Sequence, residues 1–234
     1  MGADLTSFRQ VSFTPFEPST KRSEAVVEGK TGRFRAVKGA PQIVLSICKG
    51  INEKGGEAVN RAVEELSQKG YRTLAVAKSE SNDLDTLGFV GLLSMADPIR
   101  PDSKRMIEEA KELGVKPLML TGDNINIAKE IARQASIGDN IIRMTTLKSL
   151  TETEQARIIE ECSGFAEIYP EDKYRIVKLL QSKGHMVGMT GDGVNDAPAL
   201  QKSNIGVSVG NATDVAQETA SLILLDNNFA TLVN

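Results

Sequence analysis

The stretch His185–Leu200, HMVGMTGDGVNDAPAL, places two carboxylates and an amide directly after an apolar run. Asp192 ends the expected strand, and Asn195 and Asp196 come just before a new helix. A carboxylate pair beside free backbone N–H groups suits Mg²⁺ and phosphate, because Mg²⁺ takes one or two carboxylates and completes its shell with water and phosphate oxygens. Asp-Gly also forms ordinary turns, and Asp196 could serve only as a helix N-cap. The motif therefore needs matching chemistry elsewhere in the chain.

A second Thr-Gly-Asp supplies that match. The stretches ELGVKPLMLTGDNINIAKE and SKGHMVGMTGDGVNDAPAL share a helix end, a Gly, an apolar strand, Thr-Gly-Asp and a new helix. Ligands of parallel sheets bind beyond the carboxyl ends of the strands, so Thr121, Gly122 and Asp123 should lie at the same sheet edge as Asp192. Lys173 begins the helix before the second strand and could neutralise phosphate there, although an exposed lysine is the ordinary alternative.

Three standard motifs are excluded by single residues. A dinucleotide loop would need Gly where the chain has Asp196. The Gly-Lys-Thr at 29–31 lacks the upstream Gly of a P-loop and falls in a hairpin turn. An EF-hand loop fails because Val194 takes a ligand position and Ser203 replaces the closing Glu.

The elements that must position these residues alternate strictly after about residue 97. Helices are expected at 102–114, 124–135, 151–162 and 171–184, and strands at 115–120, 165–169, 185–190, 205–209 and 221–225. Such alternation predicts right-handed βαβ crossovers and a mostly parallel sheet covered by helices on both faces.

The first part of the chain has a different rhythm. Residues 24–39 read as a hairpin around a Gly-containing turn, and strands are expected at 71–77 and 87–93. Helices are expected at 40–50 and 57–70, each followed or closed by Gly. We therefore predict two α/β domains, residues 1–93 and 94–234.

Composition places the chain among ordinary globular proteins: 40% of residues are hydrophobic and 25% charged. The net charge of −3 and an aromatic content of 4% leave no footprint for nucleic acid. The longest apolar runs are too short to span a bilayer, and no signal peptide is seen. Cys48 and Cys162 have no metal-ligand spacing, and His185 has no partner motif, so all three are expected to be structural. A soluble chain in a reducing compartment is expected.

Taken together, these motifs resemble the cytoplasmic catalytic region of a P-type cation-transporting ATPase, whose phosphorylation domain is similar to haloacid dehalogenase-like phosphotransferases. MTGDGVNDAPAL is the most specific motif, and LTGDN, YPEDKYRIVKLLQ, MADPIRPDS and TDVAQETASLILLDNNF follow the family's order. FTPFEPSTKRSEAVV, VKGAP and GYRTLAVA resemble its nucleotide-binding domain. The likeness is strongest to the plasma-membrane proton pumps. It implies a Rossmann-type parallel sheet after an antiparallel α+β nucleotide-binding domain, both incomplete on their N-terminal side.

The resemblance also implies a role for each matching residue. In the nucleotide domain, Phe16 would stack on adenine, Lys21, Lys38 and Gly39 would surround ATP, and Arg72 would hold its phosphates. Other implied roles belong to the phosphorylation domain and its hinge: phosphate contacts by Thr121, Gly122 and Asp123, phosphoryl stabilisation by Lys173, Mg²⁺ binding by Asp192 and Asp196, loop ordering by Asn195 and Asp196, and the hinge at Asp97 and Arg100. Singly, each has an ordinary explanation as a core or surface residue.

The sequence departs from the family in one large respect. The family's nucleophile is the Asp of an Asp-Lys-Thr-Gly-Thr segment, and no such segment occurs in these 234 residues. Covalent catalysis needs its nucleophile, so the chain alone is expected not to form the aspartyl-phosphate. Smaller departures are DPIR at 97–100, Gln42 and Glu167. The first phosphorylation-domain strand is also expected to be missing, which would leave an open sheet edge and a route to self-association.

The sequence thus predicts the ATP- and Mg²⁺-binding catalytic region of an ion pump, with the proton as its ion by resemblance. It would act on the cytoplasmic side of a membrane, and would meet the membrane only through transmembrane helices outside these residues. Two alternatives stay open: a nucleotide- and Mg²⁺-binding fragment without catalysis, and a soluble phosphatase of the haloacid dehalogenase type.

Overall fold

The chain forms two compact units. The structure is a computed structural model that describes residues 6–80 and 82–225. Contacts divide the chain into Met1–Asp97 and Pro98–Asn234. The boundary expected after residue 93 would cut β5 (Leu87–Met95), which stays paired with β4 as far as Met95. The division therefore falls four residues later than the sequence suggested, after Asp97 instead of residue 93.

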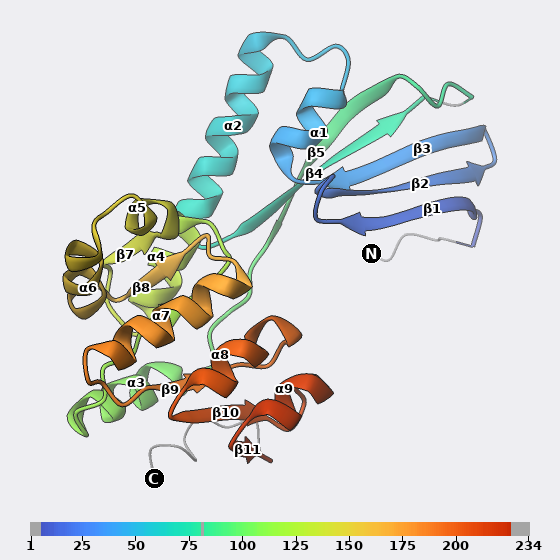
Figure 1. Cartoon of the computed structure of the whole chain (residues 1–234). Coiled ribbons are helices and arrows are strands. Elements are labelled where there is room, and N and C mark those ends of the chain that lie inside the picture. The colour runs from blue at the N-terminus through green and yellow to red at the C-terminus, as the bar shows by residue number, and fades with distance from the viewer. Residues whose placement is uncertain (1–5, 81, 226–234) are drawn as a thin grey trace. The chain divides into compact units, whose positions relative to one another are not determined.

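The first unit is a five-stranded antiparallel sheet in the order β1-β2-β3-β4-β5, accompanied by two helices (Figure 1). Its elements are β1 (Arg9–Glu17), β2 (Arg22–Gly29), β3 (Gly32–Gly39), α1 (Pro41–Ile47), α2 (Glu53–Gln68), β4 (Arg72–Ser79) and β5. The predicted hairpin is confirmed, since β2 pairs with β3 along their whole length from Arg22 to Gly39. Strand β1, which forms the edge next to β2, was not among the expected elements.

The two faces of this sheet differ in what they carry. Val44 of α1 packs in a core cluster with Val37, Ala75 and Ala77, so alternate residues of β3 and β4 point toward α1. The residues between them, such as Lys38 and Val76, must point to the opposite face because strand side chains alternate. Lys38 and Val76 are direct partners in the ladder.

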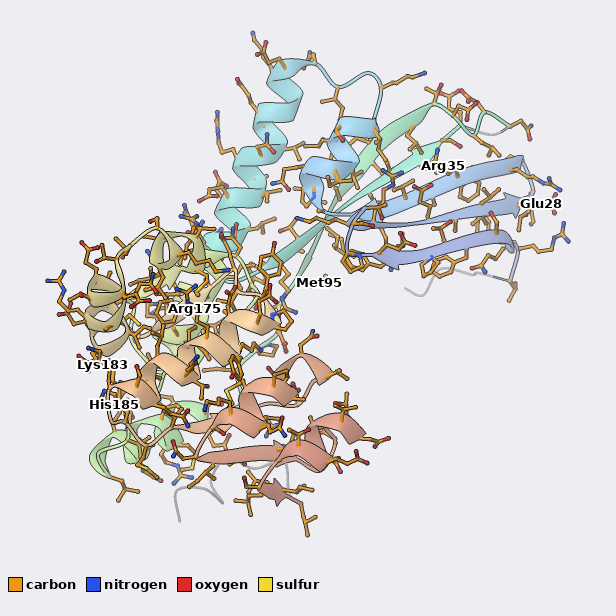
Figure 2. The ribbon with its side chains drawn as sticks, in the orientation of Figure 1. Glu28, Arg35, Met95, Arg175, Lys183 and His185 are labelled. Atoms are coloured by element: carbon orange, nitrogen blue, oxygen red, sulfur yellow. The ribbon has the colours of Figure 1, made fainter. Side chains whose placement is uncertain are left out.

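Ion pairs continue the α1-side face outward over β2 and β3. Glu24 binds Arg22 at 2.6 Å and also Arg35. Burial by itself would raise the pKa of Glu24, but the hydrogen bonds from Arg35 and Arg22 outweigh it and lower the pKa. Figure 2 shows Arg35 and, toward the outer end of the sheet, Glu28. The charged side chains of Arg22, Glu24 and Arg35 on this face are therefore paired with one another.

The second unit contains two three-stranded parallel sheets with helices around them. Its strands are β6 (Met119–Leu120), β7 (Ile141–Arg143), β8 (Gly164–Ala166), β9 (Gly188–Thr190), β10 (Ile205–Val209) and β11 (Leu222–Leu224). Its helices are α3 (Ser103–Glu112), α4 (Ile125–Gln134), α5 (Met144–Lys148), α6 (Glu152–Glu161), α7 (Pro170–Ser182), the 3-10 helix η1 (Val194–Asp196), α8 (Ala197–Lys202) and α9 (Asp214–Thr219). The mixed α/β class is confirmed. The end of the TDVAQETASLILLDNNF motif lies outside the described residues.

The single continuous sheet expected from the sequence is not what the second unit shows. The strand orders are β6-β8-β7 and β11-β10-β9, so β6 and β9 each stand at the edge of a separate sheet. Among the described residues, neither edge is hydrogen-bonded to another strand on its outer side. Each of these edge strands leads directly into a Thr-Gly-Asp turn.

Helix α7 joins the two sheets through shared packing (Figure 1). Ile176 packs in one cluster with Phe165 of β8, and the next residue, Val177, packs in another with Met189 of β9. Leu120 of β6 contacts both clusters. The residues at the start of α7 are thereby held close to the carboxyl ends of the strands in both sheets.

Three single residues were expected to be structural: His185, Cys48 and Cys162. His185 precedes β9 and lies near the C-terminal end of α7 and Lys183 (Figure 2), with its Nε2 3.1 Å from Glu160 Oε1 on the surface. Cys162 is buried and Cys48 is partly buried, both are free thiols, and burial raises the pKa of each. No helix within the described ranges has the length and apolarity to cross a membrane.

Candidate functional site

The first Thr-Gly-Asp forms a closed turn directly after β6. The Thr121 hydroxyl donates to Asp123 Oδ2 at 3.1 Å and accepts the Asp123 N–H at 3.1 Å. Asn124 then caps α4 by accepting the N–H of Asn126 at 2.9 Å. Gly122, which lies between Thr121 and Asp123, is exposed. The turn thus presents backbone to solvent while its two side chains hold its shape.

Two backbone bonds fasten this turn to the segment that leads into α7. The Ile168 N–H donates to the Thr121 carbonyl at 3.2 Å, and the Glu167 N–H donates to the Asp123 carbonyl at 3.0 Å. Helix α7 begins two residues after Ile168, and Asp172 closes its first turn by accepting the Tyr169 N–H at 3.0 Å. The turn and the base of α7 are therefore one hydrogen-bonded assembly.

Lys173 extends from the start of α7 to the second motif. Its Nζ lies 2.5 Å from Asp196 Oδ1, and the two side chains are only 18% and 8% exposed. Charge-assisted bonds of this kind are short and strong. This ion pair joins the α7 start, and with it the first turn, to the GDGVND loop.

Asp196 also organises its own loop. Its Oδ2 accepts the N–H groups of Asp192 at 3.3 Å and Gly193 at 3.2 Å. Gly191 is required beside it, because a Cβ at residue 191 would lie 2.5 Å from the Asp196 Cβ. Both carboxylate oxygens of Asp196 therefore accept hydrogen bonds from within the protein, one from Lys173 and the other from backbone N–H groups of its own loop.

Asp192 has a different environment. It is exposed, and its carbonyl accepts the Thr213 N–H at 2.9 Å, which anchors its backbone to the start of α9. Asn195 is also exposed. No group of three or more His, Cys, Asp or Glu side chains gathers around a metal position within the described ranges. One exposed carboxylate still fits Mg²⁺, since this ion is often held by one or two carboxylates with substrate phosphate and water as the other ligands.

The residues predicted to bind the nucleotide lie in the first unit, and the strand register shows which face of the sheet each one is on. Lys38 pairs with Val76, and Arg72 lies four residues earlier on β4, so both point to the face opposite α1. Phe13 pairs with Ala25, which pairs with Ala36, two residues before Lys38 on the same face. Lys38 and Arg72 are exposed, and Phe13 is 55% exposed.

Phe13, which was not among the predicted residues, is therefore an exposed aromatic side chain on the same face as Lys38. Phe16, which was among them, is 61% exposed but falls in the register shift between Thr14 and Glu17, so pairing does not assign its face. The signal that could have found Phe13 is its even spacing with the alternating residues of β1, and β1 itself was not anticipated.

Lys21 and Gly39 meet at the end of the sheet. Lys21 has a left-handed φ of 51°, and its carbonyl accepts the Ala40 N–H at 3.0 Å. A Cβ at residue 39 would lie 2.5 Å from that carbonyl oxygen. The close approach that requires glycine here is therefore made by the protein's own backbone. Asp97 and Arg100 lie at the division between the units, with the Arg100 carbonyl accepting the Ser103 N–H ahead of α3.

Two family models and several known proteins match this chain. Residues 5–102 match the family model "P-type ATPase, cytoplasmic domain N", and residues 77–204 match "haloacid dehalogenase-like hydrolase". The Methanocaldococcus jannaschii protein named "Putative cation-transporting ATPase MJ1226" is 41% identical over 236 residues, covering 98% of this chain and 29% of the relative. The Dictyostelium discoideum "Probable plasma membrane ATPase" is 39% identical over 233 residues (99% and 22%).

A third relative is "Plasma membrane ATPase 1" of Saccharomyces cerevisiae, which is 38% identical over 239 residues, covering 98% of this chain and 26% of the relative. The chain thus spans between about a fifth and a third of the length of these relatives. The first family model covers the antiparallel sheet of the first unit. The second model begins at residue 77, in β4, and covers most of the parallel α/β unit. The chain belongs to the haloacid dehalogenase-like hydrolase family and is the N and P domain region of a P-type ATPase.

Proposed function

We propose that this chain is the catalytic region of a pump that couples ATP hydrolysis, through an aspartyl-phosphate, to cation transport on the cytoplasmic side of a membrane. The observation that carries the proposal is the Lys173–Asp196 pair at 2.5 Å, in which Asp196 is buried and Lys173 partly buried, and which joins the two Thr-Gly-Asp turns. The proton is our choice of ion because two of the three relatives described above are named as plasma membrane ATPases. Ion-binding residues would lie outside these 234 residues.

The residues of the second unit suit phosphoryl transfer, in which catalysis consists largely of positioning and charge stabilisation. The attacking carboxylate would come from an Asp-Lys-Thr-Gly-Thr segment, which these 234 residues do not contain. Its oxygen would bond to the γ-phosphorus of ATP as the bond to the ADP oxygen breaks. Lys173 would neutralise charge on the transferred group, while Thr121, Gly122 and Asp123 would orient it.

Asp192 would hold Mg²⁺, which when bound supplies positive charge to phosphate oxygens. Asp196 would act by positioning, because Lys173 and two backbone N–H groups already occupy its oxygens. Asn195 would help to order the loop. ATP itself would lie on the face of the first unit that carries Lys38 and Arg72, with Lys21 and Gly39 shaping its end.

For the base of ATP, the strand register favours Phe13 over Phe16. We expect Phe13→Ala to weaken ATP binding about tenfold, because stacking on an aromatic ring contributes about 1–3 kcal/mol per base. Isothermal titration of the 234-residue chain with ATP measures the change. Phe8→Ala is the matched control, since Phe8 packs edge-on against Phe34 at a 6.0 Å centroid distance, and it should change the affinity less than twofold.

If Phe16→Ala weakens ATP binding and Phe13→Ala does not, the register argument for Phe13 fails while the nucleotide site stands. If the unmodified chain shows no ATP binding, the nucleotide-site proposal itself fails.

One second candidate function has its own support. The absence of Asp-Lys-Thr-Gly-Thr from the sequence favours a nucleotide- and Mg²⁺-binding piece without catalysis when the chain acts alone.

A further inference from the structure

Glu167 stands where β8 gives way to the segment before α7, in a backbone conformation that non-glycine residues rarely adopt. Its φ is 57°, in the left-handed region. Such a conformation is costly for a residue with a Cβ and persists only where the surroundings hold it in place. The contacts of Glu167 show what holds it.

Both the backbone and the side chain of Glu167 bind the segment that follows the first Thr-Gly-Asp turn. The Glu167 N–H donates to the Asp123 carbonyl at 3.0 Å. Its Oε1 accepts the Ile125 N–H at 3.2 Å and faces the Asn124 Nδ2 at 3.4 Å. Three consecutive residues, from the last of the turn to the first of α4, are therefore held by this one glutamate.

A third strand end joins the same carboxylate. Arg143, the last residue of β7, places its Nε 3.3 Å from Glu167 Oε1. Glu167 thus connects the carboxyl ends of β6, β7 and β8, which is the edge where the first turn stands. The carboxylate also occupies the first N–H of α4, a group that would otherwise attract an anion.

We propose that Glu167 is a positioning residue, which fixes the Thr121–Asp123 turn in the shape that receives phosphate. This inference rests on the function proposed above, because it assigns that turn a phosphate. Glu167 does not touch the phosphate and acts only through residues 123–125. Its negative charge would by itself repel phosphate, so orientation and electrostatics predict opposite effects of removing it.

The test compares two substitutions by amide chemical shifts of Gly122 and Asp123 during titration with inorganic phosphate and Mg²⁺. Glu167→Gln keeps an acceptor oxygen and removes the charge, so phosphate should bind as tightly as before or more tightly. Glu167→Ala removes the acceptor as well, and we expect about tenfold weaker binding from the lost hydrogen bonds. Glu112→Ala, which removes an exposed charge at the end of α3, should leave the phosphate affinity unchanged.

Phosphate binding to Glu167→Ala as tight as, or tighter than, to the unmodified chain would overturn the inference, because charge alone would then explain both variants. If the unmodified chain shows no phosphate response at this turn, the proposed function fails there. The positioning role is then decided by hydrogen exchange. The amides of Ile125 and residue 167 should exchange about tenfold faster in Glu167→Ala, and unchanged exchange rates would overturn it.

Discussion

Replacing Lys173 with Met is expected to destabilise the second unit by about 2–3 kcal/mol and to abolish its binding of Mg²⁺ with phosphate. The substitution would leave the Asp196 carboxylate, 8% exposed, with only two backbone donors at 3.2 and 3.3 Å. Removing one partner of a buried pair costs about 3–5 kcal/mol, and the partial exposure of Lys173 reduces that figure. Urea unfolding, with phosphate titration of the folded variant, measures both effects.

Lys178→Met is the matched control, because Lys178 is exposed on the same helix. It should change the free energy of unfolding by no more than about 0.5 kcal/mol. Asp196→Asn should cost less than Lys173→Met, since the remaining lysine is 18% exposed and its long side chain can reach water. Equal stability of Lys173→Met and Lys178→Met would show that the pair does not organise the site.

The second large effect concerns covalent chemistry. Incubated with Mg²⁺ and γ-labelled ATP, the 234 residues alone should acquire no acid-stable, hydroxylamine-sensitive label, because the sequence contains no Asp-Lys-Thr-Gly-Thr. A peptide carrying that segment at the end of an apolar strand, added in trans, should become labelled in the presence of the chain. The strand would pair with the open edges of β6 and β9, which lie at the margins of the two parallel sheets.

Two controls separate this result from chance labelling. The same peptide with Asn in place of its Asp should stay unlabelled, and the peptide with the Lys173→Met chain should be labelled far less. A covalent label on the chain alone would contradict the account.

The open edges also offer a route to self-association, as unpaired strand edges do. We expect the peptide to reduce any dimer seen by light scattering.

Much of the architecture could be predicted because it depends on local patterns. The β2–β3 hairpin was predicted from alternation around a Gly-containing turn, and α7 from the alternation of helices and strands after residue 97. Three short elements were missed, namely β7, α5 and α9, which are three to six residues long. Segments this short do not complete enough periods to stand out from loop sequence.

The sequence indicated candidate residues for the site but not the contacts between them. Lys173 and Asp196 are 23 residues apart, and only the packing of α7 on both sheets brings them to 2.5 Å. The metal role predicted for Asp196 stays a prediction, and its bonds to Lys173 and to two backbone N–H groups could not be predicted from the sequence. The choice between Phe13 and Phe16 depends on strand register, which arises from cross-strand pairing and not from the order of residues.

The central claim is that the two Thr-Gly-Asp turns and Lys173 hold one Mg²⁺-bound phosphate. Paramagnetic broadening by Mn²⁺, used in place of Mg²⁺ with inorganic phosphate, tests it most directly. The account predicts that amides of Gly122 and Asp123 broaden together with those of Asp192 and Gly193, and that Asp192→Asn removes both effects. Broadening at Asp192 that leaves Gly122 and Asp123 sharp would contradict it.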